Sequence, residues 1–590
     1  MIHVLEDLPW GFKHPEIQYW KNEKVHVYKG TFLPDELHPF ASKDFSYARW
    51  KEDELNGVVQ TPEKSANRFS LREHQAEGVK YIVQHYIQGS SDFLLADKTG
   101  IGKTLTGLAS IALCAKQAGF STSMKAKVLI VCPKTARAQW RNTIQSYPLA
   151  TGFCRFMIIN YQQLNKLLEA PPKARVAKKR STKNRQTARE GKPLINWDFV
   201  IFDESQYLKN YGKSAVSMSA ANVAQLNNTY IKGKTPYVLF STATPGSTPL
   251  HMAVLSRMLA PLITDNGKAT PNTWGKFLKE NGFNVELGKS GWVWKEPFSM
   301  NKNSSDASKR AQYEYDKMKN DQAKRRDTRR IGLALKKKNS PFLMRSPKDI
   351  EGWPDQVPVK VPIEMNATQI SVYKKEWSEF RRFLLLPAAK KNPQTALVKR
   401  KRYRQKSSLL KVDSMVDFVM DRLDVGEQVY ISCEFMDTID RYRELLEKNN
   451  VTVAEITGRY TGSERENQRL MFQKGKAKVV LCSIVEAISL HAGESLSDGT
   501  KATDNIRATI IHDIREDPNK AVQSFGRAHR EGQNSICYFP YLDKTVDVKI
   551  LDSFIDKDGN MKAMTGEEEN TIERVFKEAS ARTTPPKEYS

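Results

Sequence analysis

Residues 523–533 read QSFGRAHREGQ and carry one glutamine and two arginines at helical spacing. Gln523, Arg527 and Arg530 stand four and three residues apart, so a helix would present them on one face. Side chains of this kind on one face can converge on a single phosphate group. Arginines on a helix surface are also common without such a role. The array therefore indicates a phosphate site only if the chain also contains another part of that site.

A glycine-rich phosphate-binding pattern lies far upstream, at residues 96–104 (ADKTGIGKT), between an apolar run and a helical pattern that extends to about residue 118. Its expected phosphate-binding residues are Gly100, Gly102, Lys103 and Thr104. In such a turn the backbone amides bind the phosphates, the lysine reaches the β and γ oxygens, and the threonine hydroxyl coordinates Mg²⁺. A strict form of the pattern has glycine at position 97, where this chain has Asp97. The segment predicts an ATP and Mg²⁺ site.

Two acidic residues end another apolar run. Residues 199–206 read FVIFDESQ, which puts Asp203 and Glu204 at the end of an expected strand. Carboxylates are costly to bury there unless they meet a cation or a water molecule. We assign Asp203 to the magnesium shell and Glu204 to orienting and deprotonating the attacking water. The alternative is a structural pair of acids at a strand terminus.

These upstream motifs change the interpretation of the arginine array. With an ATP site elsewhere in the chain, Gln523, Arg527 and Arg530 are expected to stabilise the transition state at the γ-phosphate from a second lobe. Residues 241–245 (STATP) also end an apolar run. The hydroxyl groups expected to couple the nucleotide to a nucleic-acid face belong to Ser241, Thr242 and Thr244.

Length and charge narrow the class of protein. With 590 residues the chain exceeds a single hydrophobic core, so we expect two large domains with insertions. The net charge of +26 favours a polyanionic partner. Because the basic residues cluster, nucleic acid is the first candidate, although a ribosomal or membrane-surface protein can have a similar composition.

Cysteine usage and hydropathy exclude other classes. The six cysteines stand singly, mostly in apolar runs and without a CxxC pair, which predicts buried reduced thiols and argues against a zinc module. The N-terminus interrupts its apolar run with acids, and no stretch approaches the ~18 apolar residues of a membrane span. We therefore expect a soluble, intracellular protein.

Short apolar runs of strand length recur in two series, each run followed by a polar loop and a helical pattern. The first series comprises FLLA (93–96), VLIVC (128–132), FVIF (199–202) and YVLF (237–240), and the second VYIS (429–432), VVLCS (479–483), TIIHD (509–513) and SICYF (535–539). This alternation is typical of parallel sheets with helices on both faces. The sequence thus predicts two doubly wound α/β lobes.

Several segments are basic or polar instead. Lysine and arginine runs within 261–410 fit either solvated helix faces or nucleic-acid contacts, and residues 173–192 fit a loop, a nucleic-acid contact or a nuclear import signal. Residues 567–579 predict an amphipathic helix. The expected segments are an accessory segment (1–65), a first ATP-binding lobe (66–260), a helical basic insertion and linker (261–410), a second lobe (411–556), and a terminal helix and tail (557–590).

The order of these motifs resembles helicase superfamily two and, within it, the Swi/Snf-type double-stranded DNA translocases. The resemblance covers about residues 68–555 and implies two RecA-like doubly wound parallel-sheet lobes with helical, basic insertions between them. Residues 71–82 (LREHQAEGVKYI) resemble the family's adenine-reading segment, which implies that Arg72 and Gln75 lie near the base. Residues 342–374 match the link that leads out of the first lobe.

The resemblance also implies contacts with nucleic acid. Residues 128–140 (VLIVCPKTARAQW) and 157–164 (MIINYQQL) resemble the first DNA-backbone motifs, and residues 456–467 and 471–483 follow the second-lobe pattern. The implied contact residues are Pro133, Lys134, Thr135, Tyr161, Thr457, Gly458 and Ser483.

Two segments depart from the family pattern. DESQ replaces the usual DEAH or DEGH, and Gln206 can still hydrogen-bond across the cleft. In the fifth motif, SIVEAISLH (483–491) replaces a glycine-rich turn. The resemblance implies a DNA-stimulated ATPase that moves along double-stranded DNA through sequence-independent backbone contacts. An RNA or single-strand helicase, and a catalytically weak DNA-binding scaffold, remain alternatives.

Overall fold

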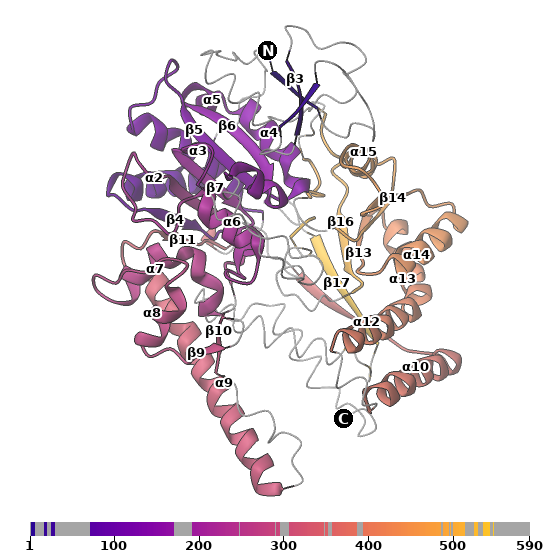
Figure 1. The fold of residues 1–590 in the computed structure, drawn as a ribbon. Coiled ribbons are helices and arrows are strands. Elements are labelled where there is room, and N and C mark those ends of the chain that lie inside the picture. Colours follow the sequence, from indigo (N-terminus) through magenta and orange to yellow (C-terminus); the bar gives the residue numbers. More distant parts are fainter. Residues whose placement is uncertain are drawn as a thin grey trace. The chain divides into compact units, whose positions relative to one another are not determined.

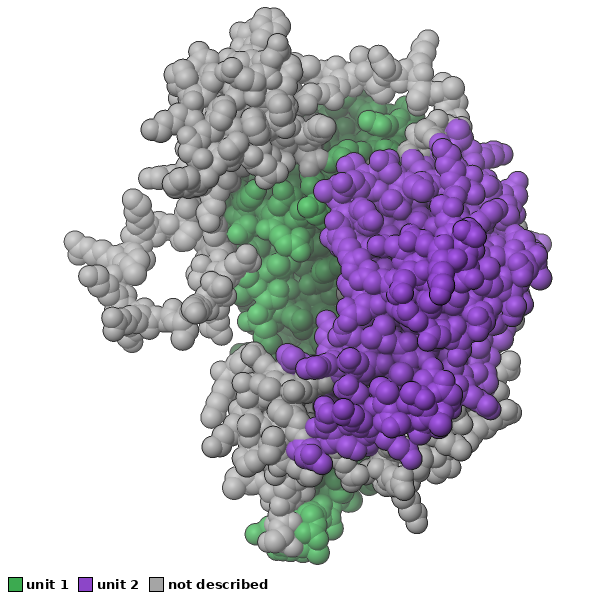
Figure 2. All heavy atoms as spheres, turned by 90° about the vertical axis from the view of Figure 1, so that its right-hand side faces the viewer, with its two compact units in different colours: residues 1–98, 102–345, 563–566 green, residues 99–101, 346–562, 567–590 purple. Residues whose placement is uncertain are grey.

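The computed structural model divides the chain into two compact units (Figure 2). Unit 1 contains residues 1–98, 102–345 and 563–566, and unit 2 contains residues 99–101, 346–562 and 567–590. Of the first 70 residues the structure describes three short strands, and after residue 542 it describes residues 545 and 547. Between 71 and 542 the residues outside the description are 99, 170–191, 247, 289–290, 296–305, 347–348, 352–356, 386–392, 485–487, 495, 497–499, 514–523, 525 and 529–534.

Unit 1 is built on a six-stranded sheet in which every pair of neighbouring strands is parallel. Its strand order is β11-β4-β8-β7-β5-β6. The strands are β4 (Asp92–Leu95), β5 (Ala126–Cys132), β6 (Cys154–Asn160), β7 (Phe199–Asp203), β8 (Tyr237–Ser241) and β11 (Phe342–Leu343). Continuous apolar runs form these strands because helices cover both faces of a parallel sheet.

Helices and 3₁₀ turns follow the strands of unit 1. The helices are α2 (Glu73–Ile87), α3 (Lys103–Gln117), α4 (Arg137–Ser146), α5 (Pro148–Phe153), α6 (Ala215–Val223), α7 (Ser256–Ile263) and α8 (Trp274–Glu280). The 3₁₀ turns are η2 (Lys134–Ala136), η3 (Tyr161–Leu167), η4 (Ser205–Leu208) and η5 (Pro249–Leu255). The main core packs Leu129, Val200 and Phe240 of the sheet against Trp274 and Ile331.

A hairpin and a long helix come before β11. Strands β9 (Val285–Gly288) and β10 (Gly291–Trp294) pair antiparallel, and α9 (Ala307–Leu335) is 29 residues long. The C-terminal end of α9 packs on the unit through Ile331 and Leu335, while its first turns extend away from the sheet (Figure 1). Its N-terminal half is largely exposed around the helix, as expected for a helix that is polar on all sides.

Unit 2 repeats the architecture with a second six-stranded parallel sheet, in the order β12-β17-β16-β13-β15-β14. The strands are β12 (Val357–Ile363), β13 (Gln428–Ser432), β14 (Val453–Ile456), β15 (Val479–Cys482), β16 (Arg507–Ile511) and β17 (Ser535–Leu542). The helices are α10 (Ala367–Leu385), α12 (Pro393–Leu410), α13 (Val412–Asp424), α14 (Met436–Lys448) and α15 (Gly462–Gln473). The expectation of two RecA-like α/β lobes is confirmed.

Other expectations from the sequence have different outcomes. All six cysteines are buried free thiols, as predicted. Near the N-terminus, where the sequence showed no pattern, β1 (Ile2–Leu5), β3 (Val25–Lys29) and β2 (Ile17–Trp20) form an antiparallel sheet. The expected loop at 173–192, apart from residue 192, and the expected helix at 567–579 lie outside the described residues. The segment boundaries stay predictions.

Candidate nucleotide-binding site

The expected motifs that follow strands of the unit 1 sheet gather at one edge of that sheet. Each follows a strand of the parallel sheet, so all lie at the carboxyl ends of the strands, where open α/β sheets bind their ligands. The phosphate-binding turn follows β4, and DESQ follows β7. Strand β8 lies between them in the sheet, so STATP stands between the two motifs. Strand order brings three distant segments together.

The phosphate-binding turn has the backbone that its glycines predict. Gly100 and Gly102 have φ values of 102° and 100°, in the left-handed region that favours glycine. A Cβ at Gly102 would also collide with the Gln75 amide. Gln75 is buried, and its Nε2 donates to the Gly102 carbonyl at 3.5 Å. The structure thus places the expected base-reading glutamine against the expected phosphate turn, and Arg72 precedes it at the start of α2.

Lys103 begins α3, with Thr104 half-buried in the first helical turn. The Lys103 Nζ donates to the carbonyl oxygens of Asp97 at 2.8 Å and Lys98 at 3.4 Å. The ammonium group is therefore folded back on the turn by two backbone acceptors. Phosphate oxygens would offer it stronger, charged acceptors in the same turn.

Asp97, which stands where the strict pattern has glycine, pairs with a residue that the sequence did not single out. Its side chain is fully buried and forms an ion pair with Arg345. The Arg345 backbone N–H donates to Asp97 Oδ1 at 2.9 Å, and its Nε donates to the same oxygen at 3.1 Å. The Arg345 guanidinium also donates to the His74 carbonyl. The one available signal was the aspartate itself, which requires a cation when buried.

The Asp203 carboxylate is buried at the end of β7. It accepts hydrogen bonds from Trp140 Nε1 at 2.8 Å and from Ser241 Oγ at 3.4 Å. Burial and then the neighbouring Glu204 charge raise the pKa of Asp203 to about 6, against the opposing effects of the Trp140 hydrogen bond and the Lys103 charge.

Glu204 occupies the left-handed region with φ 53° and ψ 52°. This backbone is uncommon for a residue other than glycine and persists where surrounding contacts hold it. The Glu204 Oε2 accepts a hydrogen bond from Gln206 Nε2 at 2.9 Å. Residues in sparsely populated backbone regions concentrate at active sites.

Gln206 connects DESQ to STATP. While its Nε2 contacts Glu204, its Oε1 accepts from the Thr242 hydroxyl at 2.6 Å. The Thr242 Oγ1 in turn accepts from the Thr244 backbone N–H at 3.0 Å. The amide of Gln206 is thus fixed by a donor and an acceptor at once. The structure brings the expected coupling residues together, and glutamine at this position maintains the connection.

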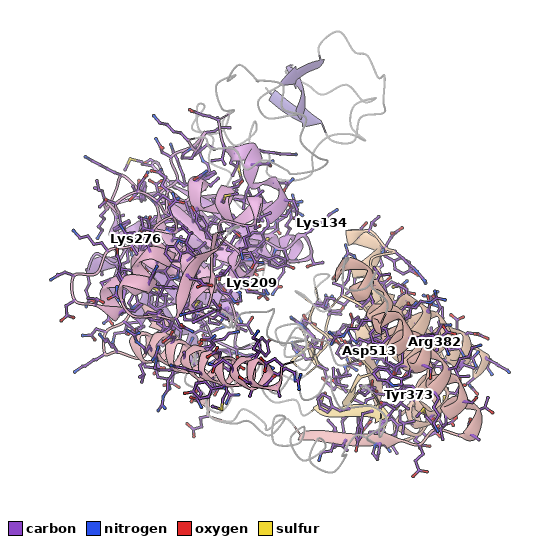
Figure 3. The ribbon with its side chains drawn as sticks, turned by 60° about the horizontal axis from the view of Figure 1, so that its bottom comes forward. Lys134, Lys209, Lys276, Tyr373, Arg382 and Asp513 are labelled. Carbon is purple, nitrogen blue, oxygen red and sulfur yellow. The ribbon has the colours of Figure 1, made fainter. Side chains whose placement is uncertain are left out.

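The expected nucleic-acid residues of unit 1 differ in exposure. Lys134 is exposed on η2 (Figure 3), whereas Pro133 is buried and Thr135 is half-buried. The Tyr161 side chain is 2% exposed, and its hydroxyl donates to the Asp203 carbonyl at 2.6 Å. In this structure the Tyr161 hydroxyl therefore contacts the DESQ segment.

The expected residues of unit 2 also lie near strand ends. Thr457 is buried and donates to Glu455 at 2.6 Å, Gly458 is exposed, and Ser483 is half-buried. Arg527 is 5% exposed, and its Nη1 donates to the Ile488 carbonyl at 3.1 Å. This contact anchors Arg527 to the altered fifth motif. Gln523 and Arg530 lie outside the described residues, so their predicted roles stay predictions.

A buried charged cluster, absent from the sequence predictions, lies at the carboxyl end of β16. The Lys411 Nζ donates to the His512 carbonyl at 2.7 Å and pairs with Asp547 at 3.3 Å and Asp513 at 3.9 Å. The His512 ring contacts the Tyr442 hydroxyl at 2.7 Å, and burial lowers its pKa to about 4. Figure 3 places Asp513 within unit 2. The cluster ties the segment before α13 to the sheet.

The residues of unit 1 suit an Mg²⁺ ion that is bound together with nucleotide phosphates. Within the described ranges, no group of three or more His, Cys, Asp or Glu side chains could hold a metal ion by itself. Mg²⁺ in nucleotide sites usually takes one or two carboxylates, water and phosphate oxygens. The buried Asp203 and the Thr104 hydroxyl fit that set.

Among the helices the structure describes, none has the length and apolar character required to span a bilayer.

Comparison with known proteins yields relatives that match parts of the chain. It is 30% identical to Switch 2 of Arabidopsis thaliana over 24% of this chain and 17% of that protein. It is 23% identical to an uncharacterized ATP-dependent helicase of Mycoplasma genitalium over 79% of this chain and 39% of that protein. The chain therefore spans well under half the length of these two relatives.

The chain is also similar to a solved structure and matches two family models. A Sulfolobus solfataricus SWI2/SNF2 ATPase core in complex with dsDNA covers 89% of this chain and 99% of its own, with 17% identity and a TM-score of 0.29. Residues 74–245 match the SNF2-related domain, and residues 410–532 match the helicase conserved C-terminal domain. Together these ranges span half of the chain. The chain belongs to the Swi/Snf-type proteins of helicase superfamily two.

Proposed function

We propose that the protein is an ATP-dependent motor that moves along double-stranded DNA. The observation that carries the proposal is the connected set of motifs at the carboxyl edge of the unit 1 sheet. A left-handed glycine turn opens α3, and the buried Asp203 at the end of β7 accepts a hydrogen bond from Ser241 of the neighbouring β8 at 3.4 Å. Gln206 joins Glu204 to Thr242 by hydrogen bonds of 2.9 and 2.6 Å.

Each residue at this edge has a proposed part in ATP hydrolysis. The turn at Gly100 and Gly102 binds phosphates through backbone N–H groups, and Lys103 exchanges its backbone acceptors for phosphate oxygens. Thr104 and Asp203 hold Mg²⁺, which supplies charge stabilisation for phosphoryl transfer.

Glu204 is the proposed general base, which takes the proton of the attacking water. Its carboxylate is held by Gln206, so the Gln206–Thr242 contact fixes the orientation of the base. Gln523, Arg527 and Arg530 are included as predicted stabilisers of the γ-phosphate. Because Arg527 is buried against Ile488, we assign direct contact first to Arg530.

Nucleic acid is the proposed partner because of charge. The chain carries a net charge of +26, and the exposed basic residues of the described part include Lys134 and the lysine run at 336–338 that follows α9. A polycation of this kind favours a phosphate backbone irrespective of sequence. The SWI2/SNF2 core bound to dsDNA suggests duplex DNA as the first ligand to test.

The test is the ATPase rate of the full chain against duplex DNA, single-stranded DNA and RNA at several salt concentrations. We expect duplex DNA to stimulate the most, with an apparent affinity that falls as salt rises, by about one unit of logarithmic slope per phosphate contact. Lys103→Ala is the negative control. Stronger stimulation by single strands or RNA would favour a helicase acting on those strands. ATPase activity unaffected by any nucleic acid would contradict the motor and favour a binding scaffold.

A further inference from the structure

Two aromatic side chains hold the Asp203 segment from different sides. The indole N–H of Trp140 donates to the Asp203 carboxylate at 2.8 Å, and the Tyr161 hydroxyl donates to the Asp203 backbone carbonyl at 2.6 Å. The exposed fractions of these side chains are 1% and 2%. Both hydrogen bonds are therefore buried, where their geometry controls the position of the acceptor strongly.

Both aromatic residues belong to segments expected at the nucleic-acid backbone. Trp140 lies on α4, which continues directly from η2 and its exposed Lys134. Tyr161 begins η3, directly after β6. The same two segments that carry the expected DNA contacts thus end, on their buried sides, at a single residue of the proposed metal site.

A third aromatic residue extends this contact to the surface. The Tyr207 ring stacks on the Tyr161 ring, with 5.1 Å between centroids and 23° between planes, and Tyr207 is 37% exposed. The Tyr207 backbone N–H also donates to the Glu204 carbonyl at 3.1 Å. Glu204, in its left-handed backbone, is therefore bracketed by the Tyr161 contact before it and the Tyr207 contact after it.

We propose that Trp140, Tyr161 and Tyr207 form a positioning relay that makes the placement of Asp203 and Glu204 depend on nucleic acid bound at the η2 and η3 segments. The relay rests on the proposed motor function and explains how a backbone contact alters hydrolysis without touching ATP. Its members are positioning residues, since they act through Asp203 and Glu204. A shift of α4 or η3 moves a hydrogen-bond donor, and the buried acceptor must follow it.

The relay predicts a reciprocal effect on binding. If bound nucleic acid changes the affinity for a non-hydrolysable ATP analogue with Mg²⁺ by some factor, the analogue with Mg²⁺ must change the affinity for nucleic acid by that same factor. Typical couplings of this kind are about 5-fold to 150-fold. This binding measurement involves no turnover and so separates coupling from chemistry.

The experiment compares Trp140→Phe and Tyr161→Phe with matched controls. Each removes one donor and keeps an aromatic ring. The control Trp274→Phe removes an equally buried indole donor, which contacts the Pro249 carbonyl at 2.8 Å. The control Tyr237→Phe removes the hydroxyl of a tyrosine that is 1% exposed, on β8. Tyr207→Ala removes the exposed ring of the relay and keeps both hydrogen bonds to Asp203.

For each full-length protein we measure the ratio of stimulated to basal ATPase rates. We also measure the affinity for a fluorescent DNA duplex with and without the analogue and Mg²⁺. Trp140→Phe and Tyr161→Phe should keep their duplex affinity without nucleotide, because both altered rings are buried. The stimulation ratio of Trp140→Phe should fall about tenfold, as for one hydrogen bond to a charged group, and that of Tyr161→Phe about fivefold, as for one to a neutral carbonyl. The analogue effect should weaken in both variants. The controls should resemble the wild type.

Each outcome decides between distinct claims. Relay variants with the wild-type ratio and analogue effect, or controls that lose as much, overturn the relay while leaving the motor intact. A wild-type protein whose ATPase ignores every nucleic acid contradicts the proposed function and the relay with it. Should Trp140→Phe fail to fold, Tyr161→Phe and Tyr207→Ala give the same decision independently.

Discussion

Replacing Arg345 with methionine tests the ion pair that closes the phosphate-binding turn of unit 1. The Asp97 side chain is 0% exposed and that of Arg345 is 11% exposed, so the substitution leaves a buried carboxylate without its cation. The 2.9 Å contact from the backbone N–H remains, while the 3.1 Å contact from Nε is lost. Removing one partner of a buried ion pair typically destabilises a protein by about 3–5 kcal/mol. We expect a loss in this range.

Urea unfolding of the full chain provides the measurement. The fluorescence of Trp140, Trp197 and Trp274, which are all buried in unit 1, follows the relevant transition. Lys276→Met is the matched control in the same unit, because the Lys276–Glu280 pair at 3.7 Å has side chains that are 70% and 60% exposed. An exposed pair contributes at most about 1 kcal/mol.

A second substitution separates the charge effect from lost packing. Adding Asp97→Asn to Arg345→Met replaces the unpaired carboxylate with a neutral amide, so the double variant should be more stable than Arg345→Met alone. The reasoning is refuted if the double variant is no more stable, or if Arg345→Met costs no more than the Lys276→Met control.

Four further outcomes follow from the sequence and the site. Lys103→Ala should abolish ATP turnover and leave DNA binding intact in an anisotropy assay; an equal loss of DNA affinity in a folded variant would contradict the separation of the two sites. Glu204→Gln should bind ATP in equilibrium titration without hydrolysing it, and near-normal turnover would remove Glu204 from the role of base. Deleting residues 173–192 should weaken DNA binding and flatten its salt dependence by about one unit of slope per lost contact, whereas an unchanged slope would indicate a solvated loop. Burial lowers the pKa of His512 from 6.5 to about 4, so the unfolded chain takes up the proton first. The free energy of unfolding should fall by on the order of 3 kcal/mol as the pH drops from 6.5 to about 4. The urea midpoint of His512→Gln should fall less steeply over the same pH range.

The alternation of apolar runs with helical patterns was sufficient to predict both parallel sheets. The run before Asp203 is an example, since β7 (Phe199–Asp203) ends at the expected carboxylate. Gly102 could likewise be predicted, because a phosphate-binding turn that enters a helix with a left-handed residue favours glycine at that position. These features depend on neighbouring residues, so a single sequence contains them.

The contacts that sequence reasoning did not predict join residues far apart in the chain. The Tyr161 hydroxyl donates to the Asp203 carbonyl, 42 residues away, and Arg527 donates to the Ile488 carbonyl. The expected roles of Tyr161 at nucleic acid and of Arg527 at a phosphate stay predictions. Neither contact follows from a local pattern, because a motif does not specify which way a side chain points from its strand end.

The sequence by itself determined the element types and the order of the motifs, and it predicted the chemistry of each one. Tertiary structure decided which motifs meet, because the strand order places STATP between the phosphate turn and DESQ. It also decided the partner of Asp97, which lies 248 residues away at Arg345. The physical reason is that a buried charge or hydrogen bond is satisfied by whatever the packed sheet brings within about 3 Å, and distance along the chain does not specify that neighbour.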